Sequence, residues 1–159
     1  VRTMPNTPAL IGLGITGVFA MAGVSESQRE SADAMLRAVG ETVWVKDEAQ
    51  LDAVTAISGS GPAYVFYFIE AMEQAATELG LSAAQGRQLA QATFAGAAAL
   101  AKASNEPVAQ LRERVTSKGG TTFAALEVMQ ASGVKAALVK ALHAAADRGR
   151  ALGDEFGRD

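Results

Sequence analysis

The sequence of 159 residues contains no cysteine and only one histidine, His143. Without cysteine, the chain can form neither a disulfide framework nor a thiolate-ligated zinc site. A single imidazole is also too few for a histidine-based metal centre, so we expect no metal. Because the absence of cysteine fits a reducing compartment, we expect the protein in the cytoplasm.

Basic charge and long apolar runs are scarce as well. The formal net charge of −3 argues against nucleic acid as a partner, because a nucleic-acid surface needs a basic patch. The densest apolar run, Tyr64–Ile69, ends at Glu70 and is much shorter than the roughly 18 residues of a membrane span. We therefore expect no membrane partner. The first residues, VRTMPNTP, lack the apolar stretch of a signal peptide, so we expect none.

The hydrophobicity that is present comes from small side chains. Hydrophobic residues make up 49% of the chain and charged residues 19%, which excludes a disordered protein. Alanine, the strongest helix former, is concentrated between Leu81 and Ala103. This segment predicts a helix that neighbouring helices can approach closely.

The first 46 residues have the pattern of an α/β fragment. Ser25 and Gln28 form the S-x-x-Q pattern of a capping box, which predicts a helix that ends at Gly40. β-branched and aromatic residues predict short strands around this helix, and Asn6-Thr7-Pro8 predicts a turn. The expected strands cover residues 1–4, 17–21 and 42–45.

From residue 47 onward, apolar residues recur at helical spacing. We expect helices over residues 51–57, 62–79, 82–104, 107–114, 121–131 and 134–152. The helix that follows Pro62 contains the run Tyr64–Ile69 and is therefore apolar on more than one face. We infer that a partner subunit covers part of it. The alternative is that the other helices of the same chain cover it.

The segment Gly12–Gly17 has the pattern G-x-G-x-x-G, which is typical of a dinucleotide-binding turn. That turn needs a strand before it and a helix after it, so that the pyrophosphate meets the helix N–H groups. Here a proline-containing turn comes before the glycines and a strand-like segment follows them. We interpret the pattern as a glycine-rich turn that leads into a strand.

Two further glycine-rich loops join the expected helices. Ser58–Ala63 is either an ordinary helix–helix turn or a place where the backbone passes close to a ligand or another backbone. Thr116–Thr122 combines two glycines with several hydroxyls directly before a helix, which suits a bound carboxylate or phosphate. The alternative is that Thr121 or Ser117 simply caps the helix and nothing binds.

Taken together, these motifs resemble the pyrroline-5-carboxylate reductase family, whose members catalyse the last step of proline synthesis. Three stretches carry the resemblance, in matching order and spacing: Met4–Pro8, Asp52–Tyr64 and Val115–Thr122, the last followed by Ala125-Leu126. Lys118 departs from the pattern, because many members have proline before the two glycines. The glycines and threonines themselves are intact.

The resemblance implies a mainly α fold. Residues 1–46 resemble the terminal strand-helix-strand of a Rossmann-like dinucleotide-binding domain. Residues 47–159 resemble an all-helical bundle domain for dimerisation and substrate binding. In this family the helical domains form an intertwined homodimer, dimers can assemble into decamers, and the site is shared across the dimer. Because most of the dinucleotide-binding domain is not in this sequence, we expect the 159-residue chain alone to be inactive.

The implied reaction is hydride transfer from NADPH or NADH to the C=N carbon of pyrroline-5-carboxylate, which gives L-proline. By resemblance, Thr122 is the catalytic residue and hydrogen-bonds the ring nitrogen, as a proton donor or as an orienting group. Backbone N–H groups and hydroxyls of the glycine loop hold the substrate carboxylate. The implied substrate-binding residues are Ser117, Gly119, Gly120, Thr121, Thr122 and Arg114.

The resemblance also implies cofactor contacts. Asn6 and Thr7 match positions at the nicotinamide end of the cofactor, and Glu48 matches a position near the ligands. The sequence leaves two other functions open: a non-catalytic helical dimerisation module, and a related reductase of another cyclic imine.

Overall fold

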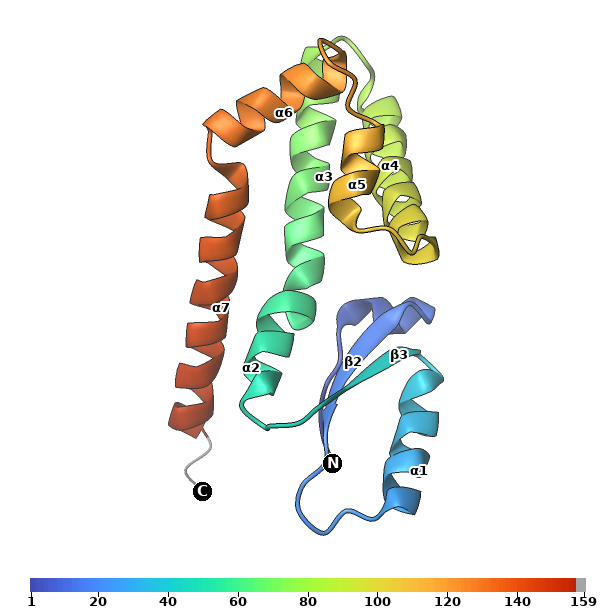
Figure 1. Ribbon diagram of the computed structural model, residues 1–159, viewed down its shortest axis with the longest axis vertical. Coiled ribbons are helices and arrows are strands. Elements are labelled where there is room, and N and C mark those ends of the chain that lie inside the picture. The colour runs from blue at the N-terminus through green and yellow to red at the C-terminus, as the bar shows by residue number, and fades with distance from the viewer. Residues whose placement is uncertain (157–159) are drawn as a thin grey trace. The chain divides into compact units, whose positions relative to one another are not determined.

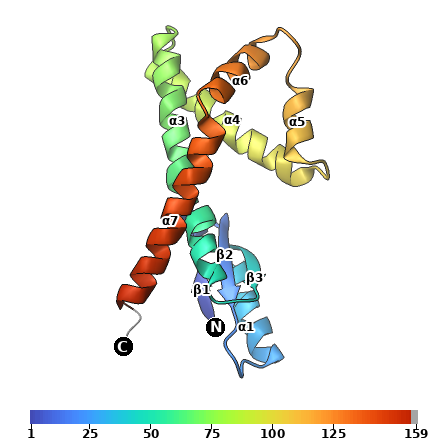
Figure 2. The same ribbon diagram turned by 60° about the vertical axis from the view of Figure 1, so that its left-hand side comes forward.

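The computed structural model describes residues 1–156. The chain forms two compact units (Figures 1 and 2). Unit 1 comprises Val1–Tyr64 together with the chain from Val139 onward, and unit 2 comprises Val65–Leu138. Each unit is described by itself below. The domain boundary expected after residue 46 stays a prediction.

Unit 1 contains a three-stranded sheet of β1 (Arg2–Met4), β2 (Gly14–Phe19) and β3 (Gly40–Val45). β1 runs antiparallel to β2, whereas β2 and β3 are parallel and pair from Gly14↔Gly40 to Phe19↔Val45. Helix α1 (Glu26–Arg37) joins the two parallel strands and lies beside β3 (Figure 1). This confirms the expected strand-helix-strand.

The glycine-rich segment before β2 does not precede a helix. Thr7–Ile11 forms a short 3-10 helix, η1, in place of the expected simple turn, and Gly12 ends it with a φ of 73°. β2 then begins at Gly14, three residues earlier than expected. The interpretation of G-x-G-x-x-G as a turn that leads into a strand is therefore confirmed.

Helix α1 begins as expected and ends earlier than expected. Ser25 and Gln28 form the capping box, with the Gln28 N–H donating to Ser25 Oγ at 3.3 Å. The expectation that Gly40 ends the helix was wrong, because Ala38 is the C-cap and Gly40 is the first residue of β3. Gly40 has a φ of 153°, and a Cβ there would collide with the backbone of Gly14. Glycine is needed at this position for close strand pairing.

Asp33 ties α1 to β3. Its carboxylate accepts hydrogen bonds from Thr42 Oγ1 at 2.5 Å, Trp44 Nε1 at 2.9 Å and Arg37 Nε at 2.5 Å. The hydrogen bond from Thr42, followed by those from Arg37 and Trp44, lowers the pKa of Asp33 from 3.8 to about 2. The charged form of Asp33 is therefore the one that joins the helix to the strand.

The core of unit 1 is small and depends on close backbone approach. The buried residues of its sheet and helices include Val18, Thr16, Ala32 and Ala56. Helix α2 (Gln50–Val54) packs against β1 and β2, and a Cβ at Gly17 would lie 2.5 Å from Val54 Cγ1. Glycine in β2 is therefore what lets α2 approach the sheet.

A π-helix interrupts the helical segment that follows the sheet. Thr55–Gly59 forms this π-helix, η2, between α2 and α3 (Gly61–Glu78). The Ser60 N–H donates to the Thr55 carbonyl at 2.8 Å, one residue further apart than in an α-helix. Pro62 lies in the first turn of α3, as expected.

The rest of the chain is helical, as expected. The helices are α4 (Ala83–Ala103), α5 (Val108–Arg114), α6 (Thr121–Ala131) and α7 (Val134–Phe156), which extends beyond the expected end near residue 152. Ser82 and Gln85 form a second capping box at the beginning of α4. Small residues let α3 and α4 approach closely, because a Cβ at Gly86 would lie 2.9 Å from the Ala76 Cβ.

The helices of unit 2 bury few of their own side chains. Within the described residues, every pair of elements in substantial contact lies in residues 1–64. α3 has no buried residue, and Phe66 and Tyr67 are 59% and 70% exposed. The alternative in which the chain's own helices cover α3 is therefore not what the structure shows, and the face is open to a partner.

The hydrogen bonds that the Asp33 carboxylate accepts predict a contribution to stability that is lost in acid. The folded-state pKa lies below the ordinary value, so the contribution is complete above 3.8 and is lost as the pH falls through about 2. We expect Asp33→Asn to lower the urea midpoint at neutral pH and the difference from wild type to shrink across this range. The fluorescence of Trp44, the only tryptophan, reports the transition. Asp47→Asn controls for the loss of one charge, and a difference that is independent of pH would contradict the prediction.

Two glycines of α4 predict opposite effects of the same substitution. Gly96→Ala should stabilise the protein by about 0.5–1 kcal/mol, because nothing lies within 4 Å of the new Cβ. Gly86→Ala should destabilise it by about 1 kcal/mol or more, because the new Cβ meets the Ala76 Cβ at 2.9 Å. Denaturant unfolding measures both variants. Equal stabilisation by both would show that α3 and α4 do not approach closely at Gly86.

Candidate functional site

The glycine loop expected to bind substrate is a tight turn that leads directly into α6. The Gly120 N–H donates to the Ser117 carbonyl at 3.0 Å, and Gly119 has a φ of 76°. This hydrogen bond and the positive φ at the third residue are the pattern of a type II turn. Lys118 then occupies the second position, where proline is common and other residues are accepted.

The N-terminus of α6 has no side-chain cap. Gly120 is the N-cap in an extended conformation, and no side chain accepts a hydrogen bond from the first turn. The alternative in which Thr121 or Ser117 merely caps the helix was therefore wrong. The first N–H groups of a helix carry partial positive charge, which leaves this terminus suited to an anionic ligand.

The turn brings together five of the six residues expected to bind substrate. The Ser117 hydroxyl lies over Gly120, where an added Cβ would be 2.6 Å from Ser117 Oγ. Thr121 and Thr122 follow in the first turn of α6, with Thr121 exposed and Thr122 partly buried. Two glycines and three hydroxyl side chains are therefore concentrated within the six residues 117–122. This arrangement supplies short-range donors for a carboxylate.

Arg114 has a different partner from the one expected. Its guanidinium group pairs with the Glu106 carboxylate, with Arg114 Nη1 and Glu106 Oε1 2.8 Å apart. Because Arg114 is the last residue of α5 and Glu106 precedes that helix, the ion pair spans the two ends of α5. The guanidinium group of Arg114 is therefore already paired with a carboxylate of the same chain. A contact between Arg114 and the substrate stays a prediction.

The residues expected on the cofactor side lie in unit 1. Thr7 is exposed in the first turn of η1, whereas Asn6 is partly buried. Glu48 forms an ion pair with Arg2, and both line a pocket of about 440 Å³. Asn6 and Thr7 do not line this pocket. Of the three residues, this pocket is therefore lined by Glu48 alone.

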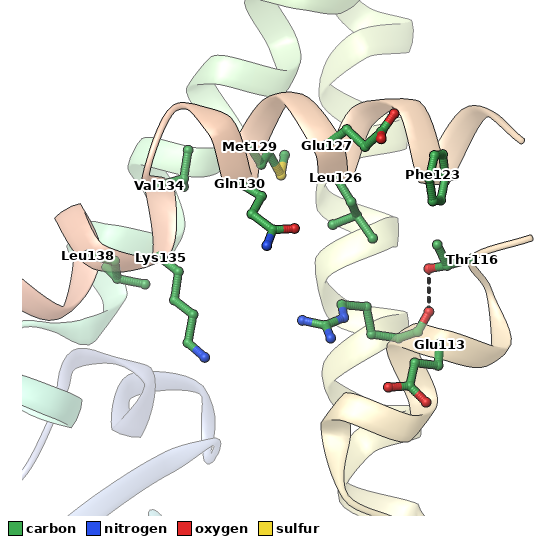
Figure 3. Close-up of a pocket in the computed structure, with 11 residues that line it drawn as sticks. Glu113, Thr116, Phe123, Leu126, Glu127, Met129, Gln130, Val134, Lys135 and Leu138 are labelled. Carbon is green, nitrogen blue, oxygen red and sulfur yellow. Dashed lines mark hydrogen bonds between the residues drawn. The ribbon is translucent and has the colours of Figure 1, made fainter. Parts of the chain in front are cut away.

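A groove of about 690 Å³ lies beside the glycine loop, between α5, α6 and the start of α7 (Figure 3). Thr116 and Phe123, which flank the loop, line it together with Leu126 of α6. None of the residues expected to bind substrate lines the groove. We did not predict it from the sequence, although the spacing of Phe123, Leu126 and Met129 along α6 signals an apolar helix face. Its lining residues are Arg112, Glu113, Thr116, Phe123, Leu126, Glu127, Met129, Gln130, Val134, Lys135 and Leu138.

Residues 1–156 contain no cluster of three or more residues that could hold a metal ion. Their helices also include none that is long and apolar enough to cross a membrane.

The model of the pyrroline-5-carboxylate reductase dimerisation family matches residues 48–152, which include α3, the glycine loop and the groove. The chain belongs to this family. The matched segment contains the exposed aromatic residues Phe66 and Tyr67 of α3.

Relatives of this family are similar to the chain over nearly its whole length. The pyrroline-5-carboxylate reductase of Pseudomonas aeruginosa is 49% identical over 158 residues, which cover 99% of this chain and 58% of that protein. A solved pyrroline-5-carboxylate reductase from Coxiella burnetii superposes with a TM-score of 0.92 at 42% identity over 95% of this chain and 56% of that one.

A third relative has a cofactor in its structure. The pyrroline carboxylate reductase of Plasmodium falciparum, solved with NADP bound, has a TM-score of 0.89 at 33% identity and covers 95% of this chain and 62% of that one. The chain thus spans somewhat more than half the length of the curated relatives it matches. Similarity over this span confirms the mainly helical fold with a short strand-helix-strand before it.

Proposed function

We propose that this chain forms the dimerisation and substrate-binding part of an NAD(P)H-dependent pyrroline-5-carboxylate reductase. The observation that carries the proposal is the uncapped N-terminus of α6 behind the Ser117–Gly120 turn, within a segment that matches the family. The reaction adds a hydride to the C=N carbon, and the electron pair of the C=N bond moves to the nitrogen, which takes up a proton. The protein therefore has to hold the substrate and provide a route by which the proton reaches the nitrogen.

The substrate carboxylate is assigned to the glycine loop. The free N–H groups at the beginning of α6 and the Ser117 hydroxyl offer several donors to one anion. Gly119 and Gly120 leave room for the carboxylate to approach the backbone. Holding the carboxylate in this way fixes the ring of the substrate relative to α6.

Thr122 is assigned to the ring nitrogen. It follows the N-cap by two residues and is partly buried in the first turn of α6. A threonine hydroxyl is a poor acid at neutral pH, so its proposed role is to orient the nitrogen and relay a proton from water. Thr121 and Arg114 complete the proposed substrate side.

The described residues offer contacts for only part of the cofactor. Gly12–Gly17 leads into a strand and does not form a phosphate-binding turn before a helix, so we assign no pyrophosphate contact to it. Thr7 is exposed beside Asn6 and suits a contact with the nicotinamide end, and Glu48 is the third proposed residue on this side. NADPH or NADH, when bound, supplies the hydride.

The same proposal includes a homodimer built on unit 2, and a decamer assembled from five such dimers. The aromatic face of α3 is exposed, and the groove beside α6 presents Leu126 and Phe123 (Figure 3). Burial of these surfaces against a second copy would supply the apolar contacts that the helices of unit 2 lack. A cytoplasmic location, which the absence of cysteine favours, stays a prediction.

Pyrroline-5-carboxylate-dependent oxidation of NADPH and of NADH tests the reaction, in the gene product that contains this chain. We expect Thr122→Ala to lower kcat/KM by about 10- to 1000-fold, because one oriented hydrogen bond at the reacting centre is lost. Thr122→Ser, which keeps the hydroxyl, is the matched control and should retain most activity. Wild-type kinetics in Thr122→Ala would contradict the assigned role. An inactive wild-type protein would favour a dimerisation module or a reductase of another cyclic imine.

The dimer interface predicts different effects at two equally exposed side chains. Tyr67 on α3 and Met35 on α1 are both 70% exposed, but only Tyr67 lies in the segment matched by the dimerisation family. Tyr67→Lys should convert the dimer to a monomer, because it places a charge in the apolar interface. Met35→Lys should leave the dimer intact. Sedimentation equilibrium distinguishes the two, and dissociation by neither variant would place the interface elsewhere.

A further inference from the structure

The carbonyl of Ser58 lacks its regular helical donor. In an α-helix, the carbonyl of residue 58 would accept a hydrogen bond from the N–H of residue 62. Residue 62 is proline and has no N–H. The π-helix η2 ends at Gly59 and does not remove the problem, because the Ala63 N–H donates to the Ser60 carbonyl at 3.0 Å. A partly buried carbonyl without a donor is costly, so another group must supply one.

Asn6 supplies that donor from far away in the sequence. Its Nδ2 donates to the Ser58 carbonyl at 3.2 Å. At the same time, its Oδ1 accepts a hydrogen bond from the Ile15 N–H at 3.0 Å. One side-chain amide thus connects the turn before η1, the beginning of β2 and the end of η2. All three lie in unit 1.

Neighbouring contacts hold the same junction. Ser58 Oγ donates to the Val54 carbonyl at 3.0 Å, which fixes the side-chain orientation of Ser58 within η2. A Cβ at Gly59 would lie 3.5 Å from Met4 Sδ, so Met4 packs over the same turn. The segment that contains Asn6 therefore rests on η2 through both a polar and an apolar contact.

We propose that Asn6 is a positioning residue for the reductase reaction, and this inference rests on the function proposed above. Its amide holds the turn that carries Thr7 against the segment Ser58–Pro62, from which α3 begins. Both amide atoms are engaged within the chain, so the main contribution of Asn6 is to place the backbone around Thr7. A direct cofactor contact contributes less than this placement.

The proline that creates the need for Asn6 also provides a test. Asn6→Asp keeps the size and the acceptor of the side chain, but it replaces the donor with an oxygen that repels the Ser58 carbonyl. Pro62→Ala restores an N–H four residues after Ser58, which can then satisfy that carbonyl. If Asn6 acts through Ser58, the second substitution should rescue the first. If Asn6 acts by touching the cofactor, it should not.

The experiment compares wild type, Asn6→Asp, Pro62→Ala and the double variant in the full gene product. Asn6→Asp combined with Pro107→Ala is the control, because Pro107 lies at the beginning of α5 and is unrelated to Ser58. We expect Asn6→Asp to lower kcat by about 10- to 100-fold, with the KM for NADPH changed less than about threefold. Pro62→Ala should restore kcat to within about threefold of wild type, and Pro107→Ala should not.

Three results would overturn the proposal. One is a rise in the KM for NADPH that Pro62→Ala does not repair, which indicates a direct cofactor contact. Another is a fall in the unfolding midpoint with unchanged kcat well below that midpoint, which indicates a structural role alone. The third is an inactive wild-type protein, which would overturn the proposed function as well. In that case, the free energies of unfolding of the two single variants and the double variant still test the structural part. Changes that are not additive show that Asn6 and Pro62 act on the same carbonyl.

Discussion

The shortage of buried apolar surface in the helices of unit 2 is the constraint on which the rest of the molecule depends. The buried residues of α4 are Gly86 and Ala90, and α3, α5 and α6 have none. Larger side chains such as Phe66 and Tyr67 face outward. Apolar burial is the main favourable contribution to folding, so these helices need a surface outside their own chain. The proposed homodimer would supply such a surface, and the dimerisation family that matches residues 48–152 supports that proposal.

This constraint links assembly to the candidate site. The Ser117–Gly120 turn is fixed locally by one hydrogen bond and a left-handed glycine, but its direction depends on α5 and α6. Those two helices frame the groove of about 690 Å³ and bury little of each other. If a second copy fills the groove, it also immobilises α6, the helix whose N-terminus is proposed to bind the substrate. Dimerisation would then be a condition for an ordered site.

Local signals in the sequence predicted local structure well. The capping box at Ser25 and the glycine loop before α6 depend on residues within four positions of one another, and both are found. The errors concern contacts over long distances in sequence. Gly40 was taken as a helix end because its pairing with Gly14 in the sheet is not visible locally. The bond between Asn6 and Ser58 spans 52 residues, and no spacing rule reports it.

Proline has different consequences in the two glycine-rich loops. At the second position of the Ser117–Gly120 turn, a proline would only preset the backbone angle, so Lys118 can replace it at a modest entropic cost in the unfolded chain. Pro62 has no N–H, so the carbonyl of Ser58, four residues earlier, lacks its helical hydrogen-bond donor. The first substitution needs no compensation elsewhere in the chain. The second leaves a carbonyl that needs another donor, and the side chain of Asn6, 52 residues away in the sequence, supplies it.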